Sequence, residues 1–376
     1  MNLLMILFVI IGLSFLILIH EAGHFTSAKL FGLKVDEFGI GFPPRIFSWR
    51  KKKNILDKSG NKKVVEGETE YSVNWLPFGG FVKIAGERGE FSAAEKISDE
   101  ISGSDESKKE SQEVDKSRLF FSQPAWKKSV ILLAGIFMNF IIGWFLISLA
   151  ISIPAPKALV ISKIEANSPA SSAGFAEGDI VKNFSNSTDF INYVNANRGK
   201  QISIDVLRQG KELNIPVTPR VSTAQNEGAV GVYLENAGHP GENFFLALID
   251  GFNATVNIAW MTLVAFGQLI AQLFLHGSLL SGVVGPIGIF GVAQETGKIG
   301  LIYFIQFLGV ISVNLAVVNL IPFPALDGGR FLITIIEKIK GSPVPEKFEM
   351  WFNGAGFAFL IVLMVLLTIR DVTNIF

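Results

Sequence analysis

The chain has 376 residues, 33 basic and 33 acidic side chains, 49% hydrophobic residues and only 18% charged residues. Soluble domains carry about a quarter charged residues, so this composition excludes an ordinary soluble protein as well as a disordered or collagenous one. The absence of cysteine excludes disulfides, iron–sulfur clusters, cysteine-ligated zinc and thiol nucleophiles, and the balanced charge gives no reason to expect nucleic-acid binding.

The chain opens with an apolar run, residues 3–19, that nearly crosses a hydrocarbon core at about 1.5 Å per helical residue. A secretory signal peptide is the disfavoured alternative, because no Lys or Arg precedes the run and no small-residue cleavage site follows it. Similar runs at 130–153, 301–321 and 357–369 predict three further spans. We therefore expect a polytopic α-helical membrane protein with about four transmembrane helices.

The Lys and Arg residues lie mostly after the first run, just before the second, and between the third and fourth. By the positive-inside rule these loops are cytoplasmic, which places the segment between the second and third runs outside. Residues 244–275 are apolar but broken by polar side chains. This pattern favours amphipathic helices lying on the surface, because a fifth span would move Lys338 and its neighbours to the wrong side.

The cytoplasmic part contains a predicted β region and a polar insert. Residues 71–75 alternate between apolar and polar side chains, and a Pro/Gly turn at 77–80 leads into 81–84, which predicts a β-hairpin. Residues 93–118 are rich in Ser, Glu, Asp and Lys and contain no aromatic residue. They cannot bury enough apolar surface to fold, so we expect a disordered insert.

The external part contains short β-branched runs within residues 157–220 and one predicted helix, Ser187–Ala196, which together predict a small α+β domain. Its series Ser168-Pro169-Ala170, Ala173-Gly174 and Gly178-Asp179-Ile180 resembles the PDZ domains of bacterial envelope proteases. Such a domain offers an edge groove that adds a peptide as an extra strand. The alternative is a spacer that only fills volume.

The segment His20-Glu21-Ala22-Gly23-His24 carries the strongest chemical signal. On a helix, two His residues four apart project from one face and can share a metal ion, while Glu21 lies beside them to handle protons. Ionisable groups at the end of a membrane helix are costly and indicate a functional site, the alternative being polar residues that cap the helix at the interface. A catalytic zinc ion takes three protein ligands, so one more is required.

Asp327 is the candidate for the third ligand, because it follows the third span on the side where the first span delivers His20. His239 and His276 belong to the external segment, on the opposite side of the membrane. The alternative role for Asp327 is a cap for the helix that begins after it. The residues around it end the preceding helix or allow close approach of neighbouring chain: Pro322, Pro324, Gly328 and Gly329.

Together, the His-Glu-x-x-His motif in the first helix, Leu326-Asp327-Gly328 after the third and the PDZ-like domain between helices two and three resemble the site-2 protease family of intramembrane zinc metalloproteases, most closely its RseP-type bacterial branch. Further agreement lies in residues 37–42, residues 77–83, Gly135 with Asn139, Ser281-Gly282, Gly285-Pro286-Ile287, Ser312-Val313-Asn314 and Asn319. The chain departs from the family in its single PDZ-like domain, its insert and Pro43-Pro44.

The resemblance implies a zinc metalloendopeptidase of the bacterial cytoplasmic (inner) membrane that cleaves transmembrane segments of single-span proteins, such as anti-sigma factors or signal-peptide remnants. Zn²⁺ would be held by His20, His24 and Asp327, with Glu21 as the catalytic base. The implied substrate contacts are Asn139, Asn314, Asn319, Pro322, Pro324 and a strand containing Tyr71, Val73 and Trp75 that pairs with the opened substrate. Partners would be membrane-protein substrates and lipid. Taken from the residues alone, Asn139 and Asn314 could equally form interhelical hydrogen bonds.

These expectations divide the chain as follows: 1–32, first helix with the metal motif; 33–128, cytoplasmic β region with the insert; 129–154, second helix; 155–221, PDZ-like domain; 222–298, extracytoplasmic interfacial helices; 299–330, third helix with the Leu-Asp-Gly motif; 331–376, cytoplasmic connector and fourth helix. One alternative function is a metal or proton transporter, but the internal repeat typical of transporters is missing. Another is a non-catalytic PDZ scaffold, which would not require Glu21.

Overall fold

The computed structural model describes residues 3–56, 62–87, 115–184, 186–208, 211–223, 228–276 and 285–375. The chain forms two compact units. The first contains Met1–Trp144, Ala254–Gly291 and Leu308–Phe376, and the second contains Phe145–Asn253 and Val292–Phe307. Most of the predicted insert, residues 93–114, lies outside the described residues, and so does Ser281-Gly282.

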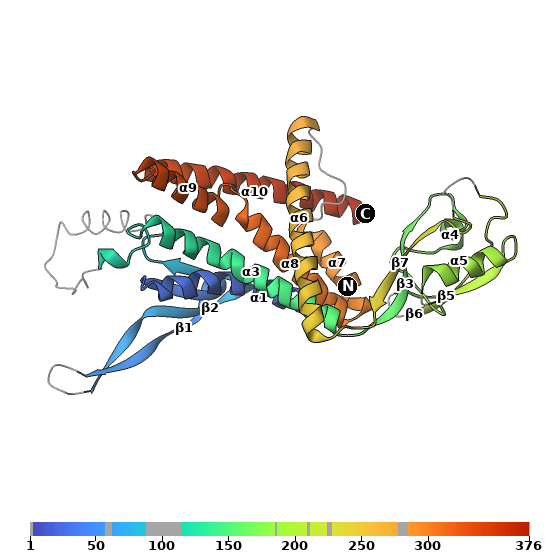
Figure 1. Ribbon diagram of the computed structural model, residues 1–376, viewed down its shortest axis with the longest axis horizontal. Helices are drawn as coiled ribbons and strands as arrows, with labels where there is room; N and C mark the ends of the chain where they lie inside the picture. The colour runs from blue at the N-terminus through green and yellow to red at the C-terminus, as the bar shows by residue number, and fades with distance from the viewer. Residues whose placement is uncertain are drawn as a thin grey trace. The chain divides into compact units, whose positions relative to one another are not determined.

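The long helices are α1 (Leu3–Leu30), α3 (Ala125–Ser152), α6 (Phe244–His276), α7 (Pro286–Ile299), α8 (Leu301–Leu320), α9 (Asp327–Lys340) and α10 (Glu346–Ile375) (Figure 1). By length and composition, five of the described helices could cross a membrane, and four of these overlap the predicted runs. The predicted count of four is not confirmed, because Phe244–Gln272 of α6 meets the same criteria with a mean hydropathy of 1.5. Its polar residues do not interrupt one continuous helix of 33 residues.

Helix α1 continues well past the apolar run that predicts it. The helix ends at Leu30, and Gly32 adopts a left-handed backbone conformation (φ 76°) just beyond. His20, Glu21 and His24 therefore lie inside a continuous helix, as the metal motif requires. The C-terminal end of α1 packs against α3 and against strands β1 and β2 through a buried apolar cluster. This cluster includes Ala28, Val35, Ile84 and Ile131.

Strands β1 (Val35–Leu56) and β2 (Lys62–Ile84) form a sheet in the first unit. Residues 37–40 of β1 pair on one side with 80–83 of β2 and on the other side with 70–73, while residues 45–50 pair with 70–74. The segments therefore lie in the order 45–50, 70–74, 37–40, 80–84. The predicted hairpin between the two parts of β2 is wrong, because residues 37–40 lie between them.

A short 3₁₀ helix, η1 (Lys116–Arg118), contains the last residues of the predicted insert. The Arg118 guanidinium donates to both carboxylate oxygens of Glu68 at 2.6 and 2.7 Å, and this hydrogen bonding lowers the pKa of the Glu68 carboxyl. Predicted disorder is therefore wrong for residues 116–118, since an ion pair to β2 holds them.

The second unit contains a five-stranded sheet in the order β6-β5-β4-β3-β7. Its elements are β3 (Ala155–Ile164), α4 (Pro169–Ala173), β4 (Ile180–Val181), α5 (Ser187–Ala196), β5 (Ile202–Arg208), β6 (Lys211–Val217) and β7 (Val232–His239). Helix α5 has the predicted bounds and packs Phe190 and Val194 into the core. The sheet extends past the predicted domain end at residue 221, because β7 pairs with β3.

The Gly178-Asp179-Ile180 segment of this unit is held by a buried ion pair. Asp179 is fully buried, and its carboxylate accepts two hydrogen bonds of 2.7 Å from the guanidinium of Arg208. It also accepts the Ala176 N–H at 3.0 Å. The hydrogen bonds to the Asp179 carboxylate raise the pKa of the Arg208 guanidinium. Asp179, which belongs to the series that predicts the domain, therefore holds the turn that leads into β4.

Candidate functional site

The two imidazoles of the His-Glu-x-x-His motif meet on one face of α1. Their Nε2 atoms lie 3.1 Å apart, and both side chains are buried. The four-residue spacing produces this arrangement, because residues four apart on a helix lie one above the other.

Asp327 begins helix α9 and brings a carboxylate to the same point. Its Oδ2 lies 2.9 Å from Nε2 of His20 and 3.3 Å from Nε2 of His24. The N-cap of α9 is Leu326, which makes no side-chain cap hydrogen bond. The Asp327 carboxylate is thus directed at the imidazoles and does not cap its helix.

The donor set fits a zinc ion. Tetrahedral zinc with bonds of about 2.0–2.1 Å requires ligand atoms about 3.3 Å apart, with two nitrogens and one oxygen as a common catalytic set. The three observed separations are 2.9, 3.1 and 3.3 Å. Within the described part of the chain, these residues are the one group of three or more His, Asp or Glu side chains that converge in this way.

Helix α3 provides the outer contacts of both imidazoles. The Nδ1 of His24 lies 2.8 Å from the backbone carbonyl of Ile131. A carbonyl can only accept, so Nδ1 carries the proton and Nε2 keeps its lone pair for a metal. The Nδ1 of His20 faces the side-chain amide of Asn139 at 3.4 Å.

Two glycines allow α1 and α3 to approach closely here. A Cβ atom on Gly135 would lie 2.5 Å from Nε2 of His24 and 2.9 Å from Cε1 of His20. A Cβ on Gly23 would lie 2.5 Å from the carbonyl oxygen of Ala134. Close helix packing is thus observed, and Gly135 in addition leaves the space that the imidazoles occupy.

Two glycines after Asp327 meet the chain that precedes α9. Cβ atoms on Gly328 and Gly329 would lie 2.3 Å from the carbonyl oxygen of Ile321 and 2.1 Å from that of Phe323, respectively. The predicted close approach is confirmed. Arg330, which the sequence interpretation missed, forms an ion pair with Glu87 and donates to its backbone carbonyl at 3.0 Å. This pair joins the start of α9 to the residues after β2.

Glu21 lies at a cavity of about 240 Å³ that His20, Asn139, Asn319 and Asp327 also line. Its Oε2 accepts a hydrogen bond of 3.1 Å from the backbone N–H of Val82 in β2. The contact of Val82 could not be predicted from the sequence. Its donor is a backbone N–H, which every residue except proline has, so the type of side chain does not indicate it.

Of the other predicted substrate residues, Asn139 and Asn319 line this cavity, and Asn314, Pro322 and Pro324 do not. Asn314 does not line it; its Oδ1 accepts a hydrogen bond of 2.7 Å from Thr262 on α6, which is the interhelical alternative. Pro322 and Pro324 lie in the turn between α8 and α9 and do not line the cavity either. Asn139 is buried against His20 and only 1% exposed.

The strand predicted to bind substrate has no free edge. Tyr71 pairs with both Phe38 and Trp49, and Val73 pairs with both Ile40 and Phe47. Trp75 is 69% exposed at the end of this segment. Strand addition at Tyr71 and Val73 is therefore blocked by neighbouring β1 segments.

Two segments of this part of the sheet, residues 45–50 and residues 80–84, are outermost and pair on one side only among the described residues. Residues 80–84 pair with residues 35–40, and they are the outer segment that contacts Glu21. Val82 is paired with Phe38 on that side and directs its N–H to Glu21 on the other.

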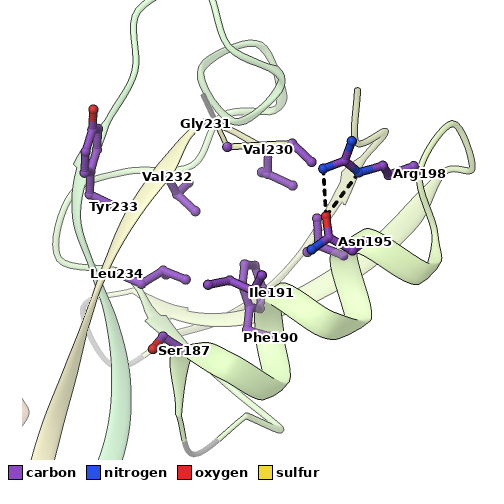
Figure 2. Close-up of a pocket in the computed structure, with 13 residues that line it drawn as sticks. Ser187, Phe190, Ile191, Asn195, Arg198, Val230, Gly231, Val232, Tyr233 and Leu234 are labelled. Atoms are coloured by element: carbon purple, nitrogen blue, oxygen red, sulfur yellow. Dashed lines mark hydrogen bonds between the residues drawn. The ribbon is translucent and has the colours of Figure 1, made fainter. Parts of the chain in front are cut away.

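A groove in the second unit lies between α5 and β7 (Figure 2). It has a volume of about 410 Å³, and its walls include Phe190, Ile191, Val232 and Leu234. Strand β7 is the last strand of the sheet, so its outer edge is unpaired within the described part of the chain.

One end of this groove carries a cation. Figure 2 shows Arg198 beyond the end of α5, at the end of the groove where Val230 and Gly231 precede β7. Its guanidinium donates to Oδ1 of Asn195 at 2.9 and 3.1 Å and to the carbonyl of Val221 at 3.3 Å. In the part of the chain that the structure describes, no carboxylate forms an ion pair with it.

Comparisons with known proteins cover nearly the whole chain. Residues 8–363 match the sequence pattern of the family described as Peptidase family M50. The chain is 29% identical to the regulator of sigma-W protease RasP of Bacillus subtilis over 96% of each chain. It is 30% identical to the zinc metalloprotease RasP of Geobacillus kaustophilus, again over 96% of each chain.

Proposed function

The chain belongs to peptidase family M50 and is an intramembrane zinc metalloprotease of the site-2 type, and we propose that His20, His24 and Asp327 hold its zinc while Glu21 serves as its base. The observation that carries this assignment is the convergence of two Nε2 atoms and one carboxylate oxygen within 3.3 Å of one another, beside Glu21 at the same cavity.

A zinc ion held by His20, His24 and Asp327 would supply Lewis-acid chemistry: it would lower the pKa of a bound water towards neutrality and polarise the scissile carbonyl. Glu21 removes a proton from the attacking water and later delivers a proton to the leaving amine. Its carboxylate is held by the N–H of Val82, which fixes its direction. Asn319, in the cavity wall, hydrogen-bonds to the opened backbone of the substrate.

A peptide bond inside a membrane helix is shielded, since its carbonyl is already hydrogen-bonded, so the substrate must unwind before attack. We place the opened segment on the free edge of residues 80–84 in place of the strand around Tyr71. Main-chain hydrogen bonds to an edge strand bind an extended peptide of almost any sequence. The contact between Val82 and Glu21 puts this edge beside the proposed base.

The substrates are membrane proteins with a single span, and the class that we favour is anti-sigma factors or signal-peptide remnants. The name of the Bacillus subtilis relative, which refers to sigma-W regulation, supports the first of these. We assign the chain to the bacterial cytoplasmic membrane, with its Lys/Arg-rich loops inside and the α+β domain outside. This assignment treats α6 as interfacial.

The groove of the second unit favours a second binding function. An extended peptide would add to the free edge of β7, with apolar side chains between β7 and α5. Its terminal carboxylate would pair with Arg198, the cation at the groove's end. The domain would thereby recognise substrates that an earlier cleavage has already shortened.

The test compares Glu21→Gln with Asp327→Asn in the purified full-length protein, using a single-span substrate and elemental analysis of zinc. Glu21→Gln should retain zinc and lose at least about a hundredfold in cleavage rate, the usual contribution of a general base. Asp327→Asn should lose zinc as well as activity. Normal zinc content in Asp327→Asn would refute the third ligand, and undiminished cleavage in Glu21→Gln would refute the base.

A further inference from the structure

Asn139 is a buried amide on α3 that the catalytic scheme above leaves without a role. It is 1% exposed, and its Nδ2 lies 3.4 Å from Nδ1 of His20. Its Oδ1 is buried and has no hydrogen-bond partner among the described residues. An amide that leaves its acceptor buried and unpaired is costly, so a different hydrogen-bonding state of this residue is expected.

The chemistry of His20 decides which end of the amide must face it. When Nε2 of His20 binds a metal ion, the imidazole proton must lie on Nδ1. Two donors, Nδ1–H and the NH₂ group, would then face each other across 3.4 Å. Rotation of the amide by half a turn replaces the NH₂ group with Oδ1, which is an acceptor.

The metal-free arrangement fits the other tautomer of the same ring. With Nδ2 of Asn139 donating to Nδ1, the proton of His20 lies on Nε2 and is donated to Oδ2 of Asp327 at 2.9 Å. The amide can thus satisfy either tautomer, by presenting its donor in one state and its acceptor in the other.

Three residues four apart on α3 face the metal motif. Ile131 accepts from His24, Gly135 leaves space for both rings, and Asn139 faces His20. The backbone carbonyl of Asn139 accepts a hydrogen bond of 2.8 Å from Ser312 on α8, which holds this part of α3 in place.

We propose that Asn139 is a positioning residue whose Oδ1 accepts the Nδ1–H of His20 in the metal-loaded enzyme, as the Ile131 carbonyl does for His24. This contact fixes the tautomer and the ring plane of His20. This positioning role differs from the two roles that the sequence suggests for Asn139, which are substrate binding and interhelical contact. The proposal rests on the metal centre of the proposed function.

The test titrates the metal-free full-length protein with Co²⁺ and follows its visible absorption spectrum, with Zn²⁺ as competitor. Asn139→Leu removes the amide at similar volume and should raise the metal Kd by about 10- to 100-fold, the usual effect of losing such a contact. Asn139→Asp keeps only acceptors and should bind within about threefold of wild type with an unchanged spectrum. Asn314→Leu removes an amide that contacts Thr262 and should leave the metal Kd unchanged.

The outcomes separate the possible roles. If Asn139→Asp binds metal as weakly as Asn139→Leu, the donor end is required and the proposal is overturned. Wild-type affinity in Asn139→Leu would overturn it as well. If Asn139→Leu does not fold, Asn139→Asp decides alone, since tenfold weaker binding contradicts an acceptor role. Absence of metal binding in the wild type would instead refute the metal centre itself.

Discussion

At the residue scale, the distance between α1 and α3 at the metal centre depends on Gly135. The nearest atoms to a Cβ at this position belong to the two proposed ligands, and the closest is Nε2 of His24 at 2.5 Å. Real Cβ contacts of this length do not occur, so any larger residue must displace an imidazole or separate the helices. The glycine therefore determines whether the ligands can take their positions.

We predict that Gly135→Ala lowers zinc content and cleavage together. The added methyl group occupies the space of the imidazoles, and we expect metal affinity to fall at least about tenfold, as with other changes that misplace ligands. Metal titration by competition with a chelating dye measures this effect.

Gly143→Ala is the matched control on the same helix. Its methyl group would meet Val313 on α8 at 2.5 Å and touches no metal ligand. Overpacking of this kind costs about 1–3 kcal/mol, so the melting temperature should fall while metal affinity stays at the wild-type value. Equal loss of metal affinity in both variants would contradict a specific role for Gly135.

At the scale of elements, the order of the β segments determines which backbone groups remain free. Residues 70–74 alternate as a substrate-binding strand should, yet neighbours on both sides use their edges. The segment 80–84 is left with one unpaired side, and its Val82 N–H contacts Glu21. Residues 45–50 form the other outer segment of this part of the sheet, so the contact with Glu21 is what distinguishes the edge of 80–84.

We predict that Val82→Pro reduces cleavage at least about tenfold without changing zinc content, because it removes the N–H that donates to Glu21 and fixes the direction of its carboxylate. Steady-state kinetics with zinc analysis measure both quantities. Val82→Ala keeps the N–H and should cleave at close to the wild-type rate. A similar loss in both variants would show that the side chain, and not the edge, is responsible.

At the scale of the whole molecule, the proposed metal centre lies in one compact unit and the proposed peptide-binding groove lies in the other. Each unit has its own buried apolar cluster, so each site has its own structural support. The proposed chemistry of the two sites is also different, since the first would bind a metal ion and the second would bind a peptide through a strand edge and a cation.

We predict that a chelator abolishes cleavage but leaves peptide binding to the groove intact. A fluorescent apolar peptide with a free C-terminal carboxylate should bind more tightly than its amidated form, and Arg198→Met should remove this difference. Fluorescence anisotropy on the full-length protein measures both affinities. Equal affinity of the two peptides for the wild type would contradict carboxylate recognition by Arg198.

Local patterns in the sequence determined the positions of the helices and the side chains that share one helix face, because both follow from the residue repeat of the helix. The apolar runs predicted four helices that the structure contains, and the four-residue spacing of His20 and His24 predicted two imidazoles on one face. Asp327 could be chosen because the order and orientation of the spans limit which residues reach His20. The bounds of α5 followed from its own sequence as well.

Tertiary packing alone decided which groups from distant elements meet. The insertion of residues 37–40 between two parts of β2, the contact between Asn314 and Thr262, and the positions of Asn139 and Val82 all join segments far apart in the sequence. The direction of side chains along one helix or strand is fixed by local backbone geometry, and the spacing of hydrophobic residues in the sequence indicates it. Which residues of two distant elements contact each other depends on how the whole elements pack, and no local sequence pattern predicts this packing.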